Sequence, residues 1–422
     1  MGEATDKAIN ARAASGEMAR LSSSVRNTAL TTLAQALREQ TDFLLAQNAL
    51  DVEAARASGT AEPLIDRLLL TSERIDGIAG ALEELALEAD PLDEVVGGHT
   101  LYNGIKLQQI RVPLGVVAMI YEARPNVTAD AAGLCLKTGN ACVLRGGSLA
   151  VHSNLAMTQV LYKAGLSVGL PEYWLQSIET TSREATTELM QLQGLIDVLI
   201  PRGSASLIKS TMENSKVPVI ETGEGNCHLY IQSEVKSEII IPILINAKTQ
   251  RPGVCNAIES VLIDESVAQR ELPAMLKALF DAEVVVHGDA LCVQAAQELE
   301  GFDRFFVPAT EEDWGREYLD MEISIKCVQD LDEAIKHINQ YSTHHSESIL
   351  TENHAAIQRF FAEIDSAAVY ANASTRFTDG GEFGLGAEIG ISTQKLHARG
   401  PMGLTALTST KFLLDGNGQI RV

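Results

Sequence analysis

The alternation of short apolar runs with helix-like segments most constrains the fold of this 422-residue chain. From Val112 onward, runs rich in Val, Ile and Leu are separated by longer amphipathic stretches. This rhythm indicates an α/β protein whose parallel sheet is buried between helices. Ligands of such sheets sit beyond the carboxyl ends of the strands, so those turns are the first place to look for function. The first series predicts strands at 115–121, 141–145, 174–178, 197–201 and 217–221, with helices at 130–137, 148–164, 183–191 and 204–215.

A second α/β series follows, and a helical block precedes both. Residues 1–90 are rich in Ala, Leu, Glu and Arg, with apolar positions three and four apart, which predicts two to four helices. The second series predicts strands at 229–231, 257–263, 283–286, 323–327, 348–350 and 367–370, with helices at 267–281, 291–299, 331–341 and 353–364.

A β-hairpin is predicted between the helical block of residues 1–90 and the first α/β series. Asn103-Gly104 separates two alternating apolar runs, and Asn-Gly is the preferred pair of a tight type I′ turn. Because an isolated hairpin is marginally stable in water, we expect it to pair with something else, such as a strand of another subunit. Lys411–Leu414 is a further expected strand.

The charge and the cysteines exclude several classes of function. A formal net charge of −23 opposes binding to nucleic acid and to anionic lipid, so a phosphate-bearing ligand would need local Arg, Lys or N–H groups. The six cysteines are spread singly without a C-x-x-C pair, which predicts reduced thiols and no metal site. The first residues resemble no signal peptide, and no apolar run is long enough for a membrane span. We therefore expect a cytoplasmic protein.

The motif search isolates one reactive candidate. A P-loop, an H-E-x-x-H zinc motif and the G-x-G-x-x-G dinucleotide fingerprint are all missing from the sequence. The His344-His345 pair is interpreted as structural or solvated. In Gln250-Arg-Pro-Gly-Val-Cys255-Asn, Pro and Gly force a turn just before a thiol. The spacing alone leaves two interpretations of Cys255 open, a buried structural cysteine and an exposed nucleophile.

Several longer motifs resemble the aldehyde dehydrogenase superfamily, and within it the γ-glutamyl phosphate reductase family. The resemblance covers the chain from about residue 5 to residue 422. The motifs are VPLGVVAMIYEARPNV from Val112, ACVLRGGS from Ala141, PRGS from Pro201, ETGEGN from Glu221, the glycine-rich run from Asn372 to Gly390, and HARGP from His397 with Gly403.

The resemblance implies an aldehyde dehydrogenase-like architecture and a defined reaction. Its parts are a Rossmann-variant NADP-binding domain (1–98 and 112–228), a second α/β catalytic domain (229–400) and a small β oligomerisation flap (99–111 and 401–422). The reaction is the NADPH-dependent reduction of L-glutamate 5-phosphate to L-glutamate 5-semialdehyde with release of phosphate. This is the second step of proline synthesis from glutamate. The expected assembly is a homo-oligomer, either a dimer or a tetramer, with a glutamate 5-kinase as a candidate partner.

Catalytic and cofactor roles follow from the matched positions. Cys255 corresponds to the nucleophile that forms a thioester, with its own backbone N–H as one oxyanion donor. Asn126 is expected either to donate to the same oxyanion or to cap the following helix; Arg124 is the alternative donor. The residues expected to contact NADP are Arg145, Gly203, Ser204 and Glu317, with Arg145 suited to a 2′-phosphate. Glu221 is expected to contact the cofactor, to be structural, or to be held away from Cys255.

Substrate-binding roles are expected for groups that can hold the anionic parts of glutamate 5-phosphate. The candidates are Arg124, Arg251, Ser374, Thr375 and Arg376; Asp379, Glu382 and Glu388 are the candidates for holding the amine. Two other functions stay open: a related aldehyde or acyl-CoA dehydrogenase with another acyl donor, and a noncatalytic nucleotide-binding protein.

Overall fold

The computed structural model describes residues 2–421 and divides the chain into two compact units. Unit 1 holds the chain up to Thr222, together with Gly384–Gly390 and the segment from Met402 onward. Unit 2 holds Gly223–Phe383 and Ile391–Pro401. No helix in the described range is both long enough and apolar enough to cross a membrane.

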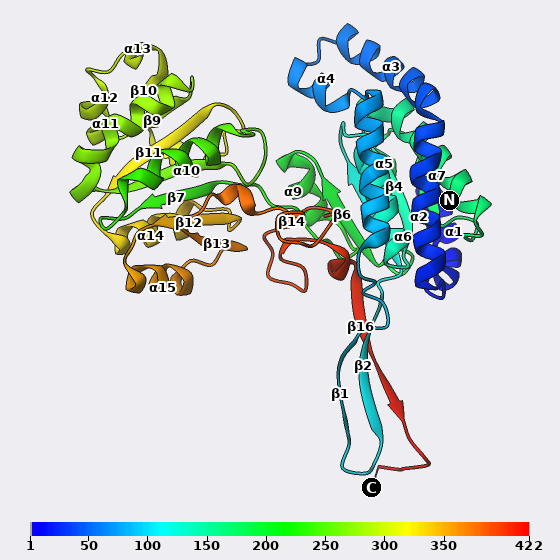
Figure 1. Cartoon of the computed structure of the whole chain (residues 1–422). Coiled ribbons are helices and arrows are strands. Elements are labelled where there is room, and N and C mark those ends of the chain that lie inside the picture. The colour runs from blue at the N-terminus through cyan, green and yellow to red at the C-terminus, as the bar shows by residue number, and fades with distance from the viewer. Residues whose placement is uncertain (1, 422) are drawn as a thin grey trace. The chain divides into compact units, whose positions relative to one another are not determined.

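A four-stranded parallel sheet, whose strands β4 and β6 are labelled in Figure 1, forms the core of unit 1. Its strand order is β5-β4-β3-β6. All six residues of β3 are buried, as expected for a central strand covered on both faces. The strands are β3 (Val116–Tyr121), β4 (Ala141–Gly146), β5 (Leu175–Ser177) and β6 (Val198–Arg202), and the helices around them are α6 (Asn126–Lys137), η1 (Ser148–Ala150), α7 (Val151–Ser167), α8 (Arg183–Met190) and α9 (Ala205–Asn214).

The expected strand at 217–221 is wrong. This segment makes only an isolated parallel bridge between Val219 and Leu199. Pro218 has no N–H to donate to a ladder, which explains why pairing stops after one bridge.

The N-terminal block contains five helices within its described residues rather than two to four. The break between α3 and α4 contains Gly59 at a positive φ of 73°, but the other three breaks contain no Gly or Pro, which are the usual sequence signals. Instead the Ser22 and Thr71 side chains accept hydrogen bonds from the Val25 and Arg74 N–H groups and start new helices. The helices are α1 (Glu3–Met18), α2 (Ser23–Glu39), α3 (Thr41–Ala57), α4 (Glu62–Leu68) and α5 (Ser72–Leu87).

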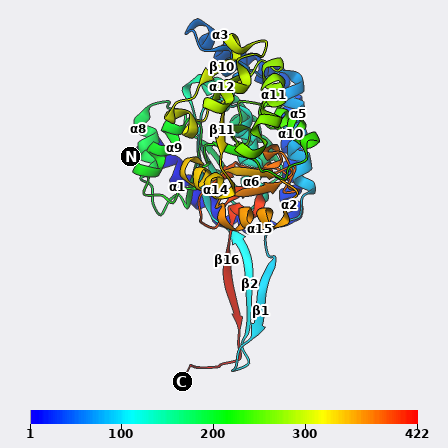
Figure 2. The same ribbon diagram turned by 90° about the vertical axis from the view of Figure 1, so that its left-hand side faces the viewer.

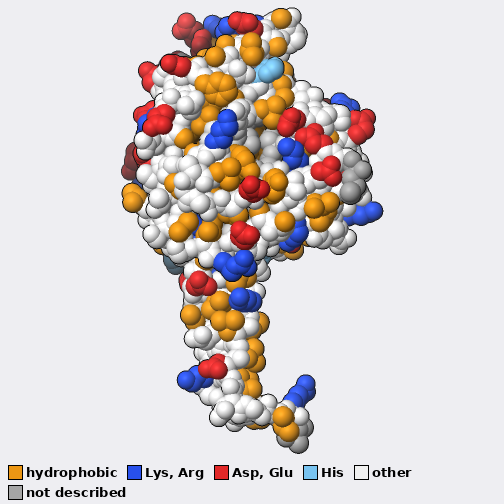
Figure 3. All heavy atoms as spheres, turned by 90° about the vertical axis from the view of Figure 1, so that its right-hand side faces the viewer, with side chains coloured by type: hydrophobic (Ala, Val, Ile, Leu, Met, Phe, Trp, Pro, Cys, Tyr) orange, Lys and Arg blue, Asp and Glu red, His pale blue; other side chains and the backbone are white. Residues whose placement is uncertain are grey.

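A three-stranded antiparallel sheet extends from unit 1 as a narrow ribbon (Figure 2). It contains β1 (Val95–Thr100), β2 (Lys106–Pro113) and β16 (Thr408–Asp415), with β2 in the middle. The hairpin is therefore confirmed, and its partner on one side is the C-terminal strand of the same chain. Apolar side chains are exposed along this ribbon (Figure 3), including Val95, Phe412 and Leu414.

The predicted turn type of the hairpin is wrong. A type I′ turn needs positive φ at both Asn103 and Gly104, but only Gly104 has it, at 87°. The Gly104 N–H donates to the Leu101 carbonyl, and the Leu101 N–H donates to the Ile105 carbonyl. This pattern is a type I turn followed by a left-handed glycine, the geometry of the next-longer hairpin loop.

A seven-stranded parallel sheet forms the core of unit 2, in the order β10-β9-β11-β8-β7-β12-β13. Its strands are β7 (Cys227–Ile231), β8 (Ile258–Asp264), β9 (Val285–Gly288), β10 (Phe306–Pro308), β11 (Glu322–Val328), β12 (Ser346–Leu350) and β13 (Ala368–Ala371). Its helices are α10 (Ser237–Thr249), α11 (Glu265–Asp281), α12 (Ala290–Ala296), α13 (Phe302–Phe305), η2 (Glu311–Gly315), α14 (Leu331–Tyr341), α15 (His354–Glu363) and η3 (Thr375–Phe377). The remaining short elements are β14 (Ile391–Ser392), β15 (Gly400–Pro401) and η4 (Leu404–Leu407).

Candidate active site

Cys255 lies in the turn between α10 and β8 and is the one half-buried cysteine of the six. The turn is closed by a hydrogen bond from the Ala257 N–H to the Val254 carbonyl. Because β8 begins directly afterwards, Cys255 is at the amino-terminal edge of the unit 2 sheet. The expectation that function gathers at carboxyl ends of strands does not hold for this residue.

The backbone of Gly225 packs directly on the backbone of Cys255. A Cβ at position 225 would lie 1.6 Å from the Cys255 carbonyl oxygen, so only glycine fits. The Gly225 N–H in turn donates a 2.6 Å hydrogen bond to Oε1 of Glu317. Burial raises the pKa of Glu317, while this N–H lowers it. The structure thus brings Glu317 beside the turn that carries Cys255.

A buried chain of polar side chains runs beneath the same turn. The Cys227 thiol donates to the Cys255 carbonyl at 3.1 Å and lies 3.7 Å from Nδ1 of His345. The same His345 nitrogen is 2.9 Å from the Ser346 hydroxyl, which is 2.6 Å from the Thr378 hydroxyl. Burial raises the pKa of Cys227 well above its ordinary value, so this thiol stays protonated.

His344 and His345, which are interpreted together from the sequence as a structural or solvated pair, have different environments. His344 is exposed, whereas His345 is fully buried at the start of β12 and contacts Cys227. Motif spacing could not reveal this contact, because Cys227 begins β7 whereas His345 immediately precedes β12, 118 residues later in the chain.

The segment around η3 covers the other side of the turn. The Thr375 hydroxyl donates to the Asn256 carbonyl at 2.7 Å, and the Asn256 amide donates to the Thr378 carbonyl at 2.9 Å. Ser374 caps η3 by accepting from the Arg376 N–H. These side chains hold the turn in place.

Two guanidinium groups lie near the thiol. Burial lowers the pKa of Arg376, and the charge of Arg251 lowers it further, so the two cations are close enough to repel. Nε of Arg376 donates to the Gln250 side chain at 3.0 Å. Within residues 2–421, neither guanidinium has a carboxylate within 4.0 Å of its nitrogens. Two neighbouring cations with no carboxylate in direct contact favour an anionic ligand.

The predicted cofactor residues of unit 1 gather at the carboxyl edge of its sheet. Arg145 ends β4 and donates to the Thr181 and Ser182 carbonyls, while Gly203 and Ser204 follow β6. At the start of α9, the Ser204 N–H donates to a carboxylate oxygen of Glu122 at 2.8 Å. A helix N-terminus that already holds a carboxylate has the donor geometry for a phosphate.

The remaining predicted residues of unit 1 lie after β3 and β6. Asn126 is the first residue of α6, is exposed, and donates to Oδ2 of Asp130 at 2.9 Å. The alternative that Asn126 caps this helix is wrong, because Pro125 occupies the N-cap position. Arg124 is half-buried in the preceding loop, and Glu221 is half-buried beyond the bridge at Val219.

The three candidates for the substrate amine differ in their surroundings. Asp379 accepts from the Gly381 and Glu382 N–H groups and lies close enough to raise the pKa of Arg376. Glu382 is exposed, while Glu388 belongs to unit 1. Asp379 therefore lies close to the arginine pair.

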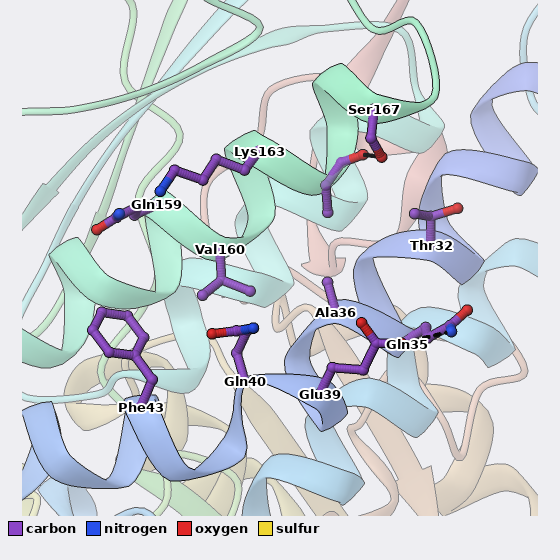
Figure 4. Close-up of a pocket in the computed structure, with 11 residues that line it drawn as sticks. Thr32, Gln35, Ala36, Glu39, Gln40, Phe43, Gln159, Val160, Lys163 and Ser167 are labelled. Carbon is purple, nitrogen blue, oxygen red and sulfur yellow. Dashed lines mark hydrogen bonds between the residues drawn. The ribbon is translucent and has the colours of Figure 1, made fainter.

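A pocket of about 550 Å³ lies elsewhere in unit 1, between α7 on one side and α2 and α3 on the other (Figure 4). It is lined by Gln35, Glu39, Phe43, Gln159 and Lys163, among others, and contains none of the predicted site residues. It carries no assigned role.

Comparison with known proteins identifies the family. The model of the aldehyde dehydrogenase family matches residues 2–291. The chain belongs to the aldehyde dehydrogenase family. It is 51% identical over 421 residues to the gamma-glutamyl phosphate reductase of Clostridium botulinum strain Alaska E43, covering 100% of both chains.

Two further relatives carry the same name. The gamma-glutamyl phosphate reductase of Thermobifida fusca is 51% identical, covering 98% of this chain and 97% of that protein. The crystal structure of gamma-glutamyl phosphate reductase from Thermotoga maritima superposes with a TM-score of 0.96 at 44% identity, covering 100% of both chains. The aldehyde dehydrogenase-like fold expected from the sequence motifs is thereby confirmed.

Proposed function

We propose that this chain reduces L-glutamate 5-phosphate to L-glutamate 5-semialdehyde with NADPH and releases phosphate. The full-length similarity to proteins named gamma-glutamyl phosphate reductase supports the substrate. The observation that carries the chemistry is the half-buried Cys255 turn beside Arg251 and Arg376. A thiol and two adjacent cations suit a nucleophile that attacks an acyl phosphate.

In the first step the Cys255 thiolate attacks the acyl carbon of the substrate. A C–S bond forms, the C–O bond to phosphate breaks, and the electron pair leaves with the phosphate. Arg251 and Arg376 stabilise both the thiolate and the departing dianion by charge. The product of this step is a thioester on Cys255.

The developing oxyanion requires hydrogen-bond donors at the reacting carbonyl. We assign the Cys255 backbone N–H to this role, with either the Asn126 amide or, as the alternative, Arg124 as the second donor. The tight contact of Gly225 with the Cys255 carbonyl fixes the peptide plane next to that N–H. The Cys227 thiol and the Asn256 amide immobilise the same turn.

The second step reduces the thioester by two electrons. NADPH, when bound, supplies the hydride for this reduction. Collapse of the resulting thiohemiacetal releases the aldehyde and returns the thiolate to Cys255. Because the thioester is resolved by reduction and not by hydrolysis, no water needs to be activated in this cycle.

For cofactor binding we assign the carboxyl edge of the unit 1 sheet. The Ser204 N–H and Gly203 would hold a phosphate of the pyrophosphate once the Glu122 carboxylate turns away. Arg145 has a buried Nε without a partner and the charge to meet a 2′-phosphate, which favours NADP over NAD. Glu317 and Glu221 are further proposed cofactor contacts.

We further propose that the ribbon of β1, β2 and β16 mediates homo-oligomerisation. The outer edges of β1 and β16 have no strand partner within the described chain, and Phe412 and Leu414 are 58% and 56% exposed. A second copy would cover both the edges and the apolar side chains.

The reaction run backwards tests the proposed function. NADP reduction is followed with glutamate 5-semialdehyde at increasing phosphate, comparing wild type with Cys255→Ala and with Cys292→Ala as a buried-cysteine control. Phosphate-dependent activity that is lost only in Cys255→Ala is the expected result. Activity without phosphate would indicate an ordinary aldehyde dehydrogenase, and nucleotide binding without turnover would indicate a noncatalytic protein.

A further inference from the structure

The fold brings together cysteines that are far apart in the sequence. Cys292 lies in the first turn of α12, just after β9, and Cys327 lies near the end of the neighbouring strand β11 (Figure 1). One oxygen of Asp289 accepts from the Leu291 and Cys292 N–H groups, and the other accepts from the Cys327 N–H. Both thiols are buried, whereas Asp289 is half-buried.

The spacing of these three side chains suits a metal ion. The two sulfur atoms and a carboxylate oxygen all lie within 4.8 Å of one another. In a tetrahedral zinc site with Zn–S bonds near 2.3 Å, neighbouring ligand atoms are about 3.8 Å apart. The distances between the ligand atoms therefore need to shorten by no more than about 1 Å for the three atoms to coordinate one ion.

The donor set decides which cation is suitable. Two thiolates and one carboxylate match soft and borderline ions such as Zn²⁺ and Cd²⁺, whereas Mg²⁺ and Ca²⁺ prefer oxygen ligands throughout. The contact with Cys327, together with burial, raises the pKa of Cys292 well above its ordinary value. A bound cation would therefore displace one proton from each thiol to solvent.

We propose that Asp289, Cys292 and Cys327 form a binding site for a thiophilic divalent cation of the Zn²⁺ class. Because Asp289 is half-buried, water can reach the ion and occupy its fourth coordination position. The site ties α12 to β11 and stabilises the outer part of the unit 2 sheet.

The site is separate from the nucleophile. Cys327 pairs with Ile263 near the carboxyl end of β8, while Cys255 precedes the amino end of the same strand. Five residues of extended strand separate the two ends by roughly 17 Å. Metal binding should therefore raise stability without blocking the thiol of Cys255.

Cadmium titration of the full chain tests the proposal, with Cys255→Ser in every sample to remove the half-buried thiol. The expected result is a cadmium–thiolate absorption band that saturates at one ion per chain and disappears in Cys292→Ser and in Cys327→Ser. Asp289→Asn should weaken binding at least tenfold. At saturating metal the melting temperature should rise by roughly 5–10 °C.

Cys135 and Cys142 provide the matched control. They are a second pair of fully buried thiols in contact, in unit 1, without a carboxylate beside them. Cys135→Ser should leave the absorption band unchanged. An absent band, or a band lost equally in Cys135→Ser and Cys292→Ser, would overturn the site. A normal rate of Cys255 alkylation by iodoacetamide in Cys292→Ser, measured with Cys255 intact, would show that the variant is folded.

Discussion

The contact between Gly225 and Cys255 makes the substitution Gly225→Ala a sharp test of how the nucleophile is positioned. The new Cβ would meet the Cys255 carbonyl oxygen at 1.6 Å and the carbonyl carbon at 2.3 Å. Cβ atoms essentially never approach closer than 3.0 Å, so the two backbones must separate by about 1.4 Å. Misplacing a reacting group by about 1 Å can cost on the order of 100-fold in rate.

We therefore expect Gly225→Ala to lower kcat/KM at least 100-fold, with a loss of about 1–3 kcal/mol in stability from overpacking. The assay combines steady-state kinetics, the rate of Cys255 alkylation and thermal unfolding. Gly315→Ala is the matched control, because its new Cβ would make only an ordinary 3.7 Å contact with Tyr341. A folded Gly225→Ala enzyme with kcat/KM within threefold of wild type would refute the reasoning.

Four further predictions follow from the same structure. Arg376→Gln should raise KM for phosphate in the reverse reaction about 10–100-fold, whereas Arg304→Gln, on the exposed surface, should not change it. Burial, His228 and Lys326 lower the pKa of His337 to about 3, so the folded state resists its protonation, and His337 should account for about 1.7 kcal/mol of lost stability as pH drops from 6.5 to 5.0. Urea unfolding should show that the loss of stability between the two pH values is smaller by this amount in His337→Phe than in wild type. Equal losses in the two proteins would contradict the prediction. Lys248 and Glu259 form a fully buried ion pair at 2.6 Å. Lys248→Met should therefore lower the free energy of unfolding by about 3–5 kcal/mol, measured with denaturant, because it leaves the Glu259 charge unpaired, and Lys248→Met/Glu259→Leu should recover most of that loss. Phe412→Ser/Leu414→Ser should shift sedimentation toward smaller species, while Leu87→Ser, 88% exposed on a helix end, should leave sedimentation unchanged.

Local patterns in the sequence were sufficient for most of the regular elements. Apolar periodicity and turn residues located all four strands of the unit 1 sheet and six of the seven strands of the unit 2 sheet, because buried parallel strands must be continuous apolar runs. The short edge strand β10 (Phe306–Pro308) was not predicted. Periodicity failed where a single N–H or hydroxyl group determines whether a strand pairs or a helix begins. Pro218 removes the N–H that a strand at 217–221 needs, and the cap hydroxyls of Ser22 and Thr71 divide a block that contains few Gly or Pro residues.

The candidate site was only partly accessible to sequence reasoning. The turn at Cys255 is local, so Pro252 and Gly253 signalled it directly. The contacts of Cys227 with His345 and of Gly225 with Cys255 join segments that meet only after the sheet has formed. The same holds for Cys292 and Cys327, which have no spacing signal in the sequence.

Formation of the thioester can be observed by stopped-flow absorbance with glutamate 5-semialdehyde and NADP in the absence of phosphate. We expect a rapid burst of one NADPH per chain that then stops, because the acyl group stays on Cys255, and steady turnover once phosphate is added. Cys255→Ala should show neither phase. Continuous NADPH formation without phosphate, or a normal burst in Cys255→Ala, would contradict acyl-phosphate chemistry at this thiol.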